Sequence, residues 1–246
     1  GCLMFLVLGF ANGMAQGFGV MVSHSFGAKD FKLLKHYVAL SLILTAIVSL
    51  LLTIPTVAAS RQFLILMKTP DNILGLADSY IKVIFAGILL TMSYNVAAGI
   101  LRGIGDSKTP LYFLILCSIW NVILDLISVI GLNMGVAGVA VATVGSQAIS
   151  AVICILVMFR KYPNLMPKRH TLRPDMPVSL KIFGMGAQMA LQSLFLSVGM
   201  MVITRVINGY GSNVVAEFTV GSKVQTLAEM LLRNFSLGFS VSVGKK

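Results

Sequence analysis

The chain has 246 residues, of which 57% are hydrophobic and only 11% are charged, and its mean hydropathy is +0.91. A water-soluble domain carries about 25% charged residues, so this composition excludes a soluble globular protein and predicts an integral membrane protein. The formal charge of +11 is spread in short basic groups between apolar runs, which indicates membrane topology signals and excludes a nucleic-acid-binding face.

Seven segments are long and apolar enough to cross a bilayer, which takes about 20 residues of helix. They cover residues 2–23, 37–58, 79–101, 111–131, 135–159, 181–207 and 214–240. The pattern predicts an all-α membrane protein with about seven transmembrane helices. Four charged residues interrupt the last segment, although Glu229 and Arg233 stand one helical turn apart and can pair.

The first segment contains a repeat of small residues. Gly9, Gly13 and Gly17 recur at every fourth position, with Asn12 and Gln16 beside them. This G-x-x-x-G spacing is typical of helices that pack closely in a membrane. We therefore expect a tight helix contact here, with the alternative that the two amide side chains line a cavity.

Two connections between the apolar segments are long. Residues 61–82 stay partly apolar, and we expect them to lie along the membrane surface. Residues 160–181 are basic and contain four prolines, which argues against a continuous helix. We interpret 160–181 as a cytoplasmic linker between a first bundle, 1–159, and the start of a second, 182–246.

Lys and Arg residues are distributed unevenly between the two sides of the predicted bundle. One side receives Arg61, Lys68, Lys82 and Arg205. The other receives Lys29, Lys32, Lys35, Arg102, Lys108, Arg160, Lys161, Lys168, Arg169, Arg173, Lys181, Lys245 and Lys246. The more basic side is expected to face the cytoplasm, which places the chain in the cytoplasmic membrane with its N-terminus outside and its C-terminus inside.

Polar residues form a stripe on the fourth predicted helix. Ser118, Asn121, Asp125 and Ser128 follow one another at spacings of three, four and three, which puts them on one helical face. An ionised Asp at the bilayer centre costs about 2.5–3.5 kcal/mol on insertion scales, so intramembrane carboxylates usually mark ion pathways. We predict that Asp125 binds a proton or cation; the alternative is a structural Asp satisfied by Asn121 or a neighbouring helix.

The next predicted helix adds further oxygen atoms. Thr143 and Gln147 share a face, and Gly138 allows a neighbouring helix to approach. Thr143 could complete an oxygen-rich site with Asn121 and Asp125, of the kind that a small hard cation such as sodium needs. The alternative is that these side chains only hold helices together.

A second candidate site involves uncharged amides. Gln188 and Gln192 share one face of the segment 181–207, among Met and Phe side chains that suit an adaptable pocket. The sequence contains no Ser/His/Asp set and no metal-ligand spacing, so we expect neither enzymatic activity nor a cofactor.

Several stretches, in this order, resemble the multidrug and toxic-compound extrusion (MATE) family of cation-coupled exporters. They are GFGVMVSHSFGAKD, YNVAAGILRGIGDSKTPLYF, NVILDLISVIGLNMGVAGVAVATVGSQ, FGMGAQMALQSLFLSVG and INGYGSNVVAEF. The resemblance covers nearly the whole chain. It implies a fold of twelve helices in two lobes of six, of which this chain would hold helices two to eight.

The resemblance also assigns roles to residues. Asn121, Asp125 and Thr143 match the fifth-helix Asn and Asp and the sixth-helix Thr that bind the coupling proton or sodium in one branch of the family; a fourth residue, a first-helix Asp, would precede Gly1. Another branch uses a seventh-helix Glu, where this chain has Ser193 and Leu194.

The function implied is export of amphipathic, often cationic drugs or toxins across the cytoplasmic membrane by proton or sodium antiport. Gln188 and Gln192, together with Tyr94 and Asn95, are expected to line the substrate cavity. The expected partners are a small-molecule substrate, membrane lipid and the missing helices of the full-length protein, and not nucleic acid; the fragment alone is expected to be inactive. The alternatives are a lipid-linked oligosaccharide flippase of the same wider superfamily, which needs Arg or Lys in its cavity, and a non-transporting membrane scaffold.

Overall fold

The computed structural model describes residues 2–66, 71–166 and 175–208, together with the single positions 218, 221, 222 and 225. In these parts of the chain every element is a helix, because an apolar segment in lipid has to satisfy its backbone hydrogen bonds internally. The elements are α1 (Cys2–Gly27), α2 (Phe31–Leu66), α3 (Asp71–Ala86), α4 (Ile88–Gly103), α5 (Lys108–Leu126), the π turn η1 (Ile127–Gly131), α6 (Gly135–Lys161), the 3-10 turn η2 (Pro163–Leu165) and α7 (Met176–Asn208).

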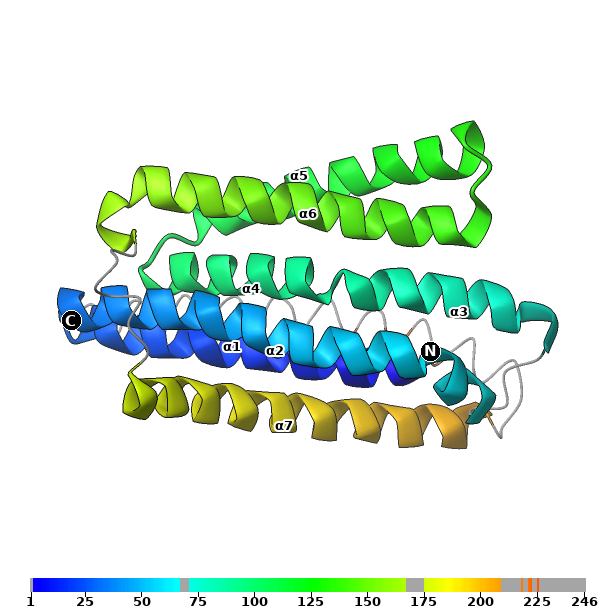
Figure 1. Ribbon diagram of the computed structural model, residues 1–246, viewed down its shortest axis with the longest axis horizontal. Helices are drawn as coiled ribbons and strands as arrows, with labels where there is room; N and C mark the ends of the chain where they lie inside the picture. The colour runs from blue at the N-terminus through cyan, green and yellow to red at the C-terminus, as the bar shows by residue number, and fades with distance from the viewer. Residues whose placement is uncertain are drawn as a thin grey trace.

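The long helices run roughly parallel or antiparallel in layers (Figure 1). Helices α5 and α6 pair on one side, α3 and α4 lie end to end beneath them, α1 and α2 follow, and α7 covers the far side of α1. The main contacts therefore connect α7 to α1, α1 to α4, α4 to α6, and α6 to α5. This order of neighbours positions the candidate site described below.

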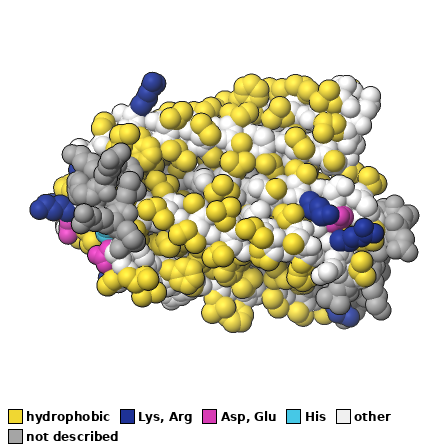
Figure 2. Space-filling model, in the orientation of Figure 1, with side chains coloured by type: hydrophobic (Ala, Val, Ile, Leu, Met, Phe, Trp, Pro, Cys, Tyr) yellow, Lys and Arg dark blue, Asp and Glu magenta, His cyan; other side chains and the backbone are white. Residues whose placement is uncertain are grey.

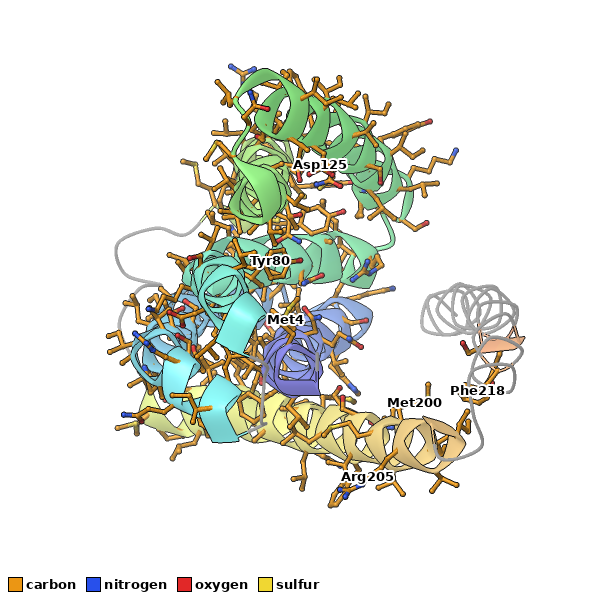
Figure 3. All side chains as sticks on the ribbon, turned by 90° about the vertical axis from the view of Figure 1, so that its right-hand side faces the viewer. Met4, Tyr80, Asp125, Met200, Arg205 and Phe218 are labelled. Carbon is orange, nitrogen blue, oxygen red and sulfur yellow. The ribbon has the colours of Figure 1, made fainter. Side chains whose placement is uncertain are left out.

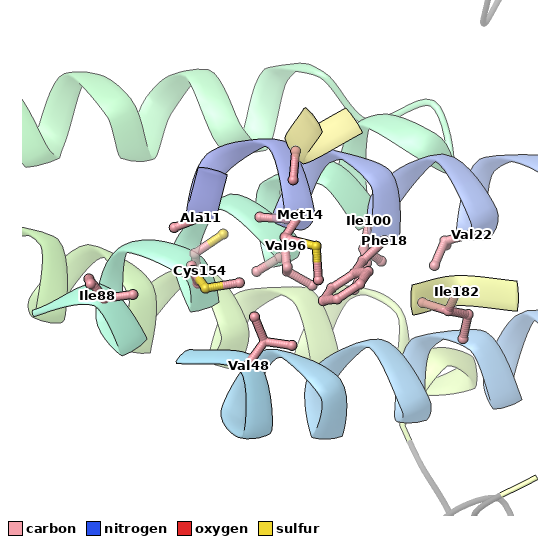
Figure 4. Close-up of a cluster of buried hydrophobic side chains, with 14 of the residues drawn as sticks. Ala11, Met14, Phe18, Val22, Val48, Ile88, Val96, Ile100, Cys154 and Ile182 are labelled. Carbon is pink, nitrogen blue, oxygen red and sulfur yellow. The ribbon is translucent and has the colours of Figure 1, made fainter. Parts of the chain in front are cut away.

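The apolar core lies between α1, α2 and α4 (Figure 4). Met14 and Phe18 of α1 are fully buried there, against α4 residues such as Val96 and Ile100. Dense packing of this kind makes α1 and α4 the rigid centre of the bundle.

Among the described residues, five helices are long and apolar enough to cross a membrane, and a sixth span is counted if α3 and α4 are taken together. These six spans correspond to the first six predicted segments, and the all-α membrane fold is confirmed. The seventh predicted segment, 214–240, lies outside the described residues apart from the four single positions.

The predicted span 79–101 is not one straight helix. The chain bends by 41° where α3 meets α4, at Gly87. Gly87 has ψ near −2°, and its carbonyl accepts hydrogen bonds from the amides of Leu90 and Thr91 at 3.0 and 3.1 Å, so the helix restarts after it. A Cβ atom on Gly87 would lie 2.5 Å from Cγ2 of Val144 on α6, so a larger residue at this bend would have to displace Val144.

Residues 61–82, which we expect to lie along the membrane surface, are helical wherever the structure describes them. Helix α2 continues to Leu66, and α3 begins at Asp71 and packs against it. Ser60 of α2 donates a hydrogen bond to Asp78 of α3 at 2.6 Å, and Lys82 donates to the same carboxylate at 2.7 Å. These polar contacts join the two helices into a hairpin, in which Leu64 is buried while Phe63 and Ile65 are exposed. The position of this hairpin at the membrane surface stays a prediction.

The predicted linker, 160–181, is shorter in the structure. Helix α6 extends to Lys161 and α7 begins at Met176, while residues 167–174 lie outside the described part of the chain. The assignment of 1–159 and 182–246 to separate lobes stays a prediction.

The surface has the charge distribution of a membrane-spanning bundle. Hydrophobic side chains cover its middle, and charged side chains gather towards the two ends (Figure 2). The connection from α1 to α2, the connection from α4 to α5 and the end of α6 share one end of the bundle, and this is the end with more Lys and Arg.

Candidate functional site

Asp125 lies in the last turn of α5, two residues before the π turn η1. Figure 3 shows it in the layer formed by α5 and α6. Its oxygen Oδ1 is shielded from solvent and makes no hydrogen bond within the described residues. A buried carboxylate oxygen without a donor is unusual, because native structures nearly always satisfy such groups. Asp125 therefore has the capacity to accept a proton or a cation.

Asn121 and Thr143 meet across the interface between α5 and α6. The amide Nδ2 of Asn121 lies 3.5 Å from Oγ1 of Thr143, at the long limit of a hydrogen bond, and the Thr143 hydroxyl donates to the carbonyl of Val139 at 2.9 Å. Asn121 stands one helical turn before Asp125, so both side chains point from the same face of α5. The structure thus brings together two of the predicted residues and places the third one turn away.

Glycines of α6 allow α5 to approach closely beside this site. A Cβ atom on Gly138 would lie 3.1 Å from Cβ and 3.2 Å from the carbonyl oxygen of Ser128, and one on Gly145 would lie 3.6 Å from Leu124. A larger residue at Gly138 would push η1, which continues α5, away from α6, whereas a Cβ atom on Gly145 would make an ordinary contact with Leu124.

The chemistry of the donor set fits a proton or a hard monovalent cation. A carboxylate, an amide oxygen and a hydroxyl are all hard oxygen ligands. Asn121 directs its Nδ2 towards Thr143. Its Oδ1 makes no hydrogen bond in the described chain and is available as a ligand. The residues fit a sodium ion as well as a proton, and their role in binding either one stays a prediction.

The four predicted cavity residues do not form one cluster of hydrogen bonds. The Tyr94 hydroxyl donates to the carbonyl of Pro110 at 3.3 Å, and Asn95 donates to Oδ1 of Asn12 at 2.8 Å, so both serve contacts between helices. Gln188 and Gln192 lie on an exposed face of α7 and make no hydrogen bond within the part of the chain that is described. The two glutamines are therefore the free amides of the predicted set.

The predicted site omitted a polar contact in the middle of the bundle. Thr91 of α4 donates a hydrogen bond to Oε1 of Gln147 on α6. Thr91 stands one turn before Asn95, and Gln147 one turn after Thr143. The sequence spacing already places Gln147 on the face of Thr143, but its partner Thr91 emerges only from the packing of α4 against α6.

A second carboxylate, Asp106, lies between α4 and α5 at the basic end of the bundle. It accepts hydrogen bonds from the backbone and hydroxyl of Thr109 at 3.1 and 2.7 Å, from Lys161 at 2.8 Å and from Tyr162 at 3.0 Å. Burial alone would raise the pKa of Asp106, but these donors, with Lys161 the strongest, lower it to about 2. Asp106 is consequently a fully satisfied anion that fastens the start of α5 to the end of α6.

Comparison with known proteins gives a consistent result. The MatE family model matches residues 2–127, just over half of the chain. The chain is 29% identical over 248 residues to the probable multidrug resistance protein YoeA of Bacillus subtilis, covering 98% of this chain and 53% of that protein.

Two solved structures share its fold. One is a multidrug resistance MATE family transporter of the MOP superfamily in an outward-facing conformation, with a TM-score of 0.88 and 25% identity over 99% of this chain and 55% of the other. The second is a MOP superfamily transporter from Pyrococcus furiosus described as having a binding pocket of reverse polarity, with a TM-score of 0.87 and 26% identity, again covering 99% and 55%. The chain spans about half the length of the curated relatives it matches.

Proposed function

The chain belongs to the MatE family, and from that premise we propose that the full-length protein exports amphipathic, often cationic compounds across the cytoplasmic membrane in exchange for protons or sodium ions. The multipass membrane fold supports transport as the activity. The family assignment supports small organic molecules as the cargo.

One observation carries the proposal: the buried Oδ1 of Asp125 lacks a hydrogen-bond donor. A carboxylate in this position lowers the free energy of the protein when a cation or proton joins it, because an isolated charge is poorly solvated inside a bundle. Asn121 and Thr143 supply further oxygens from α5 and α6. Uptake of the coupling ion is thereby tied to the packing of two helices.

Coupling follows from competition between two arrangements of these helices. The ion binds the arrangement in which all three side chains converge, and it can shift the equilibrium only by the difference between its affinities for the two arrangements. Release on the opposite side of the membrane returns the bundle to the other arrangement. Substrate moves in the reverse direction during the same cycle.

The substrate is proposed to contact α7. Gln188 and Gln192 are exposed and unpaired in the described chain, and uncharged amides accept cationic and neutral compounds alike. Tyr94 and Asn95 contribute from α4, although their hydroxyl and amide groups already serve neighbouring helices.

The test is Asp125→Asn in the full-length protein, which removes the charge and keeps the shape. A proton gradient or, in a separate experiment, a sodium gradient would be imposed across everted membrane vesicles. The accumulation of the cationic dye ethidium inside the vesicles would then be measured. We expect Asp125→Asn to reduce gradient-driven accumulation at least tenfold while the amount of protein in the membrane is unchanged.

The matched control is Asp175→Asn. Asp175 precedes α7, its side chain is 48% exposed, and it lies 3.9 Å from His36, far along the chain from the proposed site. This variant should accumulate the dye as the unmodified protein does. Unchanged accumulation in Asp125→Asn would refute the assignment of the ion site.

A further inference from the structure

Polar side chains form a continuous series across four helices of the bundle. It consists of three hydrogen-bonded pairs, which we call the polar ladder: Asn121 with Thr143, Gln147 with Thr91, and Asn95 with Asn12. The pairs join α5 to α6, α6 to α4, and α4 to α1. This is the same order in which the helices pack against one another.

Within each helix the consecutive members of the ladder stand one turn apart. Thr143 and Gln147 are four residues apart on α6, and Thr91 and Asn95 are four residues apart on α4. Residues at this spacing lie above one another on the same helical face. A rotation or shift of α6 that alters the contact at Thr143 must therefore also alter the contact at Gln147.

Thr91 has two alternative acceptors. Its hydroxyl lies within hydrogen-bond distance of Gln147 Oε1 and also 3.2 Å from the carbonyl of Gly87. A hydroxyl carries a single hydrogen, so it can donate to only one of them at a time. Gly87 is the position at which α3 and α4 bend, and it packs against Val144, the neighbour of Thr143. The Thr91 hydroxyl can therefore either bond to Gln147, which joins α4 to α6, or bond to Gly87 within its own helix at the bend.

The far end of the ladder reaches the contact between α1 and α7. Asn12 is adjacent to Gly13, and a Cβ atom on Gly13 would lie 2.5 Å from Cα of Ala190 on α7. With so little space, α1 cannot move without α7 sliding or separating from it. The ladder therefore connects the proposed ion site to the surface on which α7 rests.

We infer that the polar ladder transmits occupancy of the Asp125 site to the packing of α1 against α7, with Thr91 as the residue that switches. This inference rests on the proposed function and adds positioning residues to it. Thr91, Gln147 and Asn12 act as positioning residues, and Asn95, which is also proposed to contact the substrate, contributes through its hydrogen bond to Asn12. The alternative is that these polar pairs only hold the helices together. In that case, apolar residues of the same size would pack equally well at these positions, and replacing the polar side chains would leave the coupling unchanged.

The experiment measures how the ion site controls the position of α7. Spin labels on Ile130→Cys in η1, which follows α5, and on Val202→Cys in α7 are both at exposed positions. Double electron–electron resonance between them reports the separation of η1 from α7. The full-length protein would carry no other reactive cysteine; Cys154 is fully buried and can stay. Asp125→Asn mimics the neutral, occupied site. The measured quantity is the ratio of molecules with a short to molecules with a long distance between the two labels. The factor by which Asp125→Asn changes this ratio is the coupling.

Thr91→Val keeps the shape of the side chain and removes its hydroxyl. We expect it to reduce the coupling about threefold to tenfold, which is the contribution of one hydrogen bond between membrane helices. Thr91→Ser should restore the coupling, and Gln147→Leu combined with Thr91→Val should cause no further loss, because both remove the same contact.

The matched control is Thr53→Val. The Thr53 hydroxyl also joins two helices, donating to the carbonyl of Phe85 at 3.2 Å, but it lies outside the ladder. Its loss should leave the coupling unchanged. An unaltered coupling in Thr91→Val, or an equal loss in Thr53→Val, overturns the ladder. If the ladder is overturned but Asp125→Asn still abolishes dye export, the proposed function stands without the ladder. Intact dye export in Asp125→Asn would overturn both the proposed function and the ladder.

Discussion

Two carboxylates of this bundle have opposite environments. Asp106 accepts four hydrogen bonds at the basic end of the bundle, whereas Oδ1 of Asp125 has no donor in the described chain. The first arrangement stabilises a permanent anion, and the second leaves a carboxylate that gains from binding a cation. The contrast separates a structural acid from a candidate functional one.

The low pKa of Asp106 predicts a pH-dependent contribution to stability. Its pKa in the folded protein is about 2, below the reference value of 3.8, so the stabilisation is complete above about pH 4 and is lost as the pH falls through 2. Asp106→Asn should lower the free energy of unfolding by about 2 kcal/mol at pH 7, as judged by thermal unfolding in detergent.

A graded variant checks the cause of this loss. Tyr162→Phe removes one donor to Asp106 and leaves the bond from Lys161 at 2.8 Å in place. It should cost less than Asp106→Asn. An equal cost would contradict the view that several donors share the stabilisation of the carboxylate.

The residues of α5 and α6 could be foreseen from the sequence, and Thr91 could not be singled out. Asn121 and Asp125 stand out because amide and acid groups are rare in an apolar helix. Thr91 is a common residue in such helices and gains its importance only from Gln147, which lies 56 positions further along the chain. Periodicity reports which face a residue occupies, but not which helix that face meets.

At the level of helices, the contact of α1 with α7 depends on small residues in both partners. Cβ atoms on Gly13 and Gly17 would lie 2.5 Å from the Cα atoms of Ala190 and Gly186, and one on Gly9 would lie 3.0 Å from the Ser197 hydroxyl. The repeat of glycines predicted a close helix contact, and the structure confirms it. The partner helix was not predicted, since a repeat on one helix does not identify the opposing one.

Substitution in this contact should be costly. Gly13→Ala places a methyl group against the backbone of α7, which has no side chain to move aside. We expect a loss of about 1–3 kcal/mol in the free energy of unfolding, the usual range for overpacking, measured by thermal unfolding in detergent.

Gly184→Ala is the control on α7, because a Cβ atom there would meet nothing within 4 Å. It should be neutral or slightly stabilising, as alanine favours a helix over glycine. A similar loss in both variants would contradict a specific role of the contact with α1, because helix propensity alone predicts a gain for Gly→Ala.

Helix boundaries were predicted less well than helix positions. A hydropathy window averages over about 20 residues, so it merged α3 and α4 into one span and gave no sign of the bend at Gly87. It also ended α2 too early, because Ser60 and Arg61 lower the local hydropathy. Ser60 is buried against Asp78, a long-range contact that a local average does not contain.

For the whole molecule, charge and length together define how the bundle sits in the bilayer. Helix α2 has 36 residues and is about 54 Å long, well above the roughly 30 Å of a hydrocarbon core. Helix α2 is therefore longer than the core that it crosses. The basic end is expected in the cytoplasm.

Labelling of single cysteines in intact cells tests this orientation. Leu132→Cys, in the connection between α5 and α6, is 63% exposed and should react with a membrane-impermeant maleimide. Ser107→Cys, in the connection from α4 to α5, should react only after the membrane is permeabilised. Reaction of Ser107→Cys in intact cells would reverse the topology. Both variants require Cys2 and Cys117 to be replaced, so that no native thiol contributes signal.

The pairing of α1 with α7 also has a consequence for biosynthesis. The glycines of α1 meet residues of α7 that lie about 170–190 positions later in the chain. At roughly 5–20 residues per second, a ribosome needs on the order of 10–30 seconds to reach them. During that interval the glycine face of α1 lies in the membrane or the translocon without α7 packed against it. This face is therefore the surface that an insertion chaperone would most usefully cover.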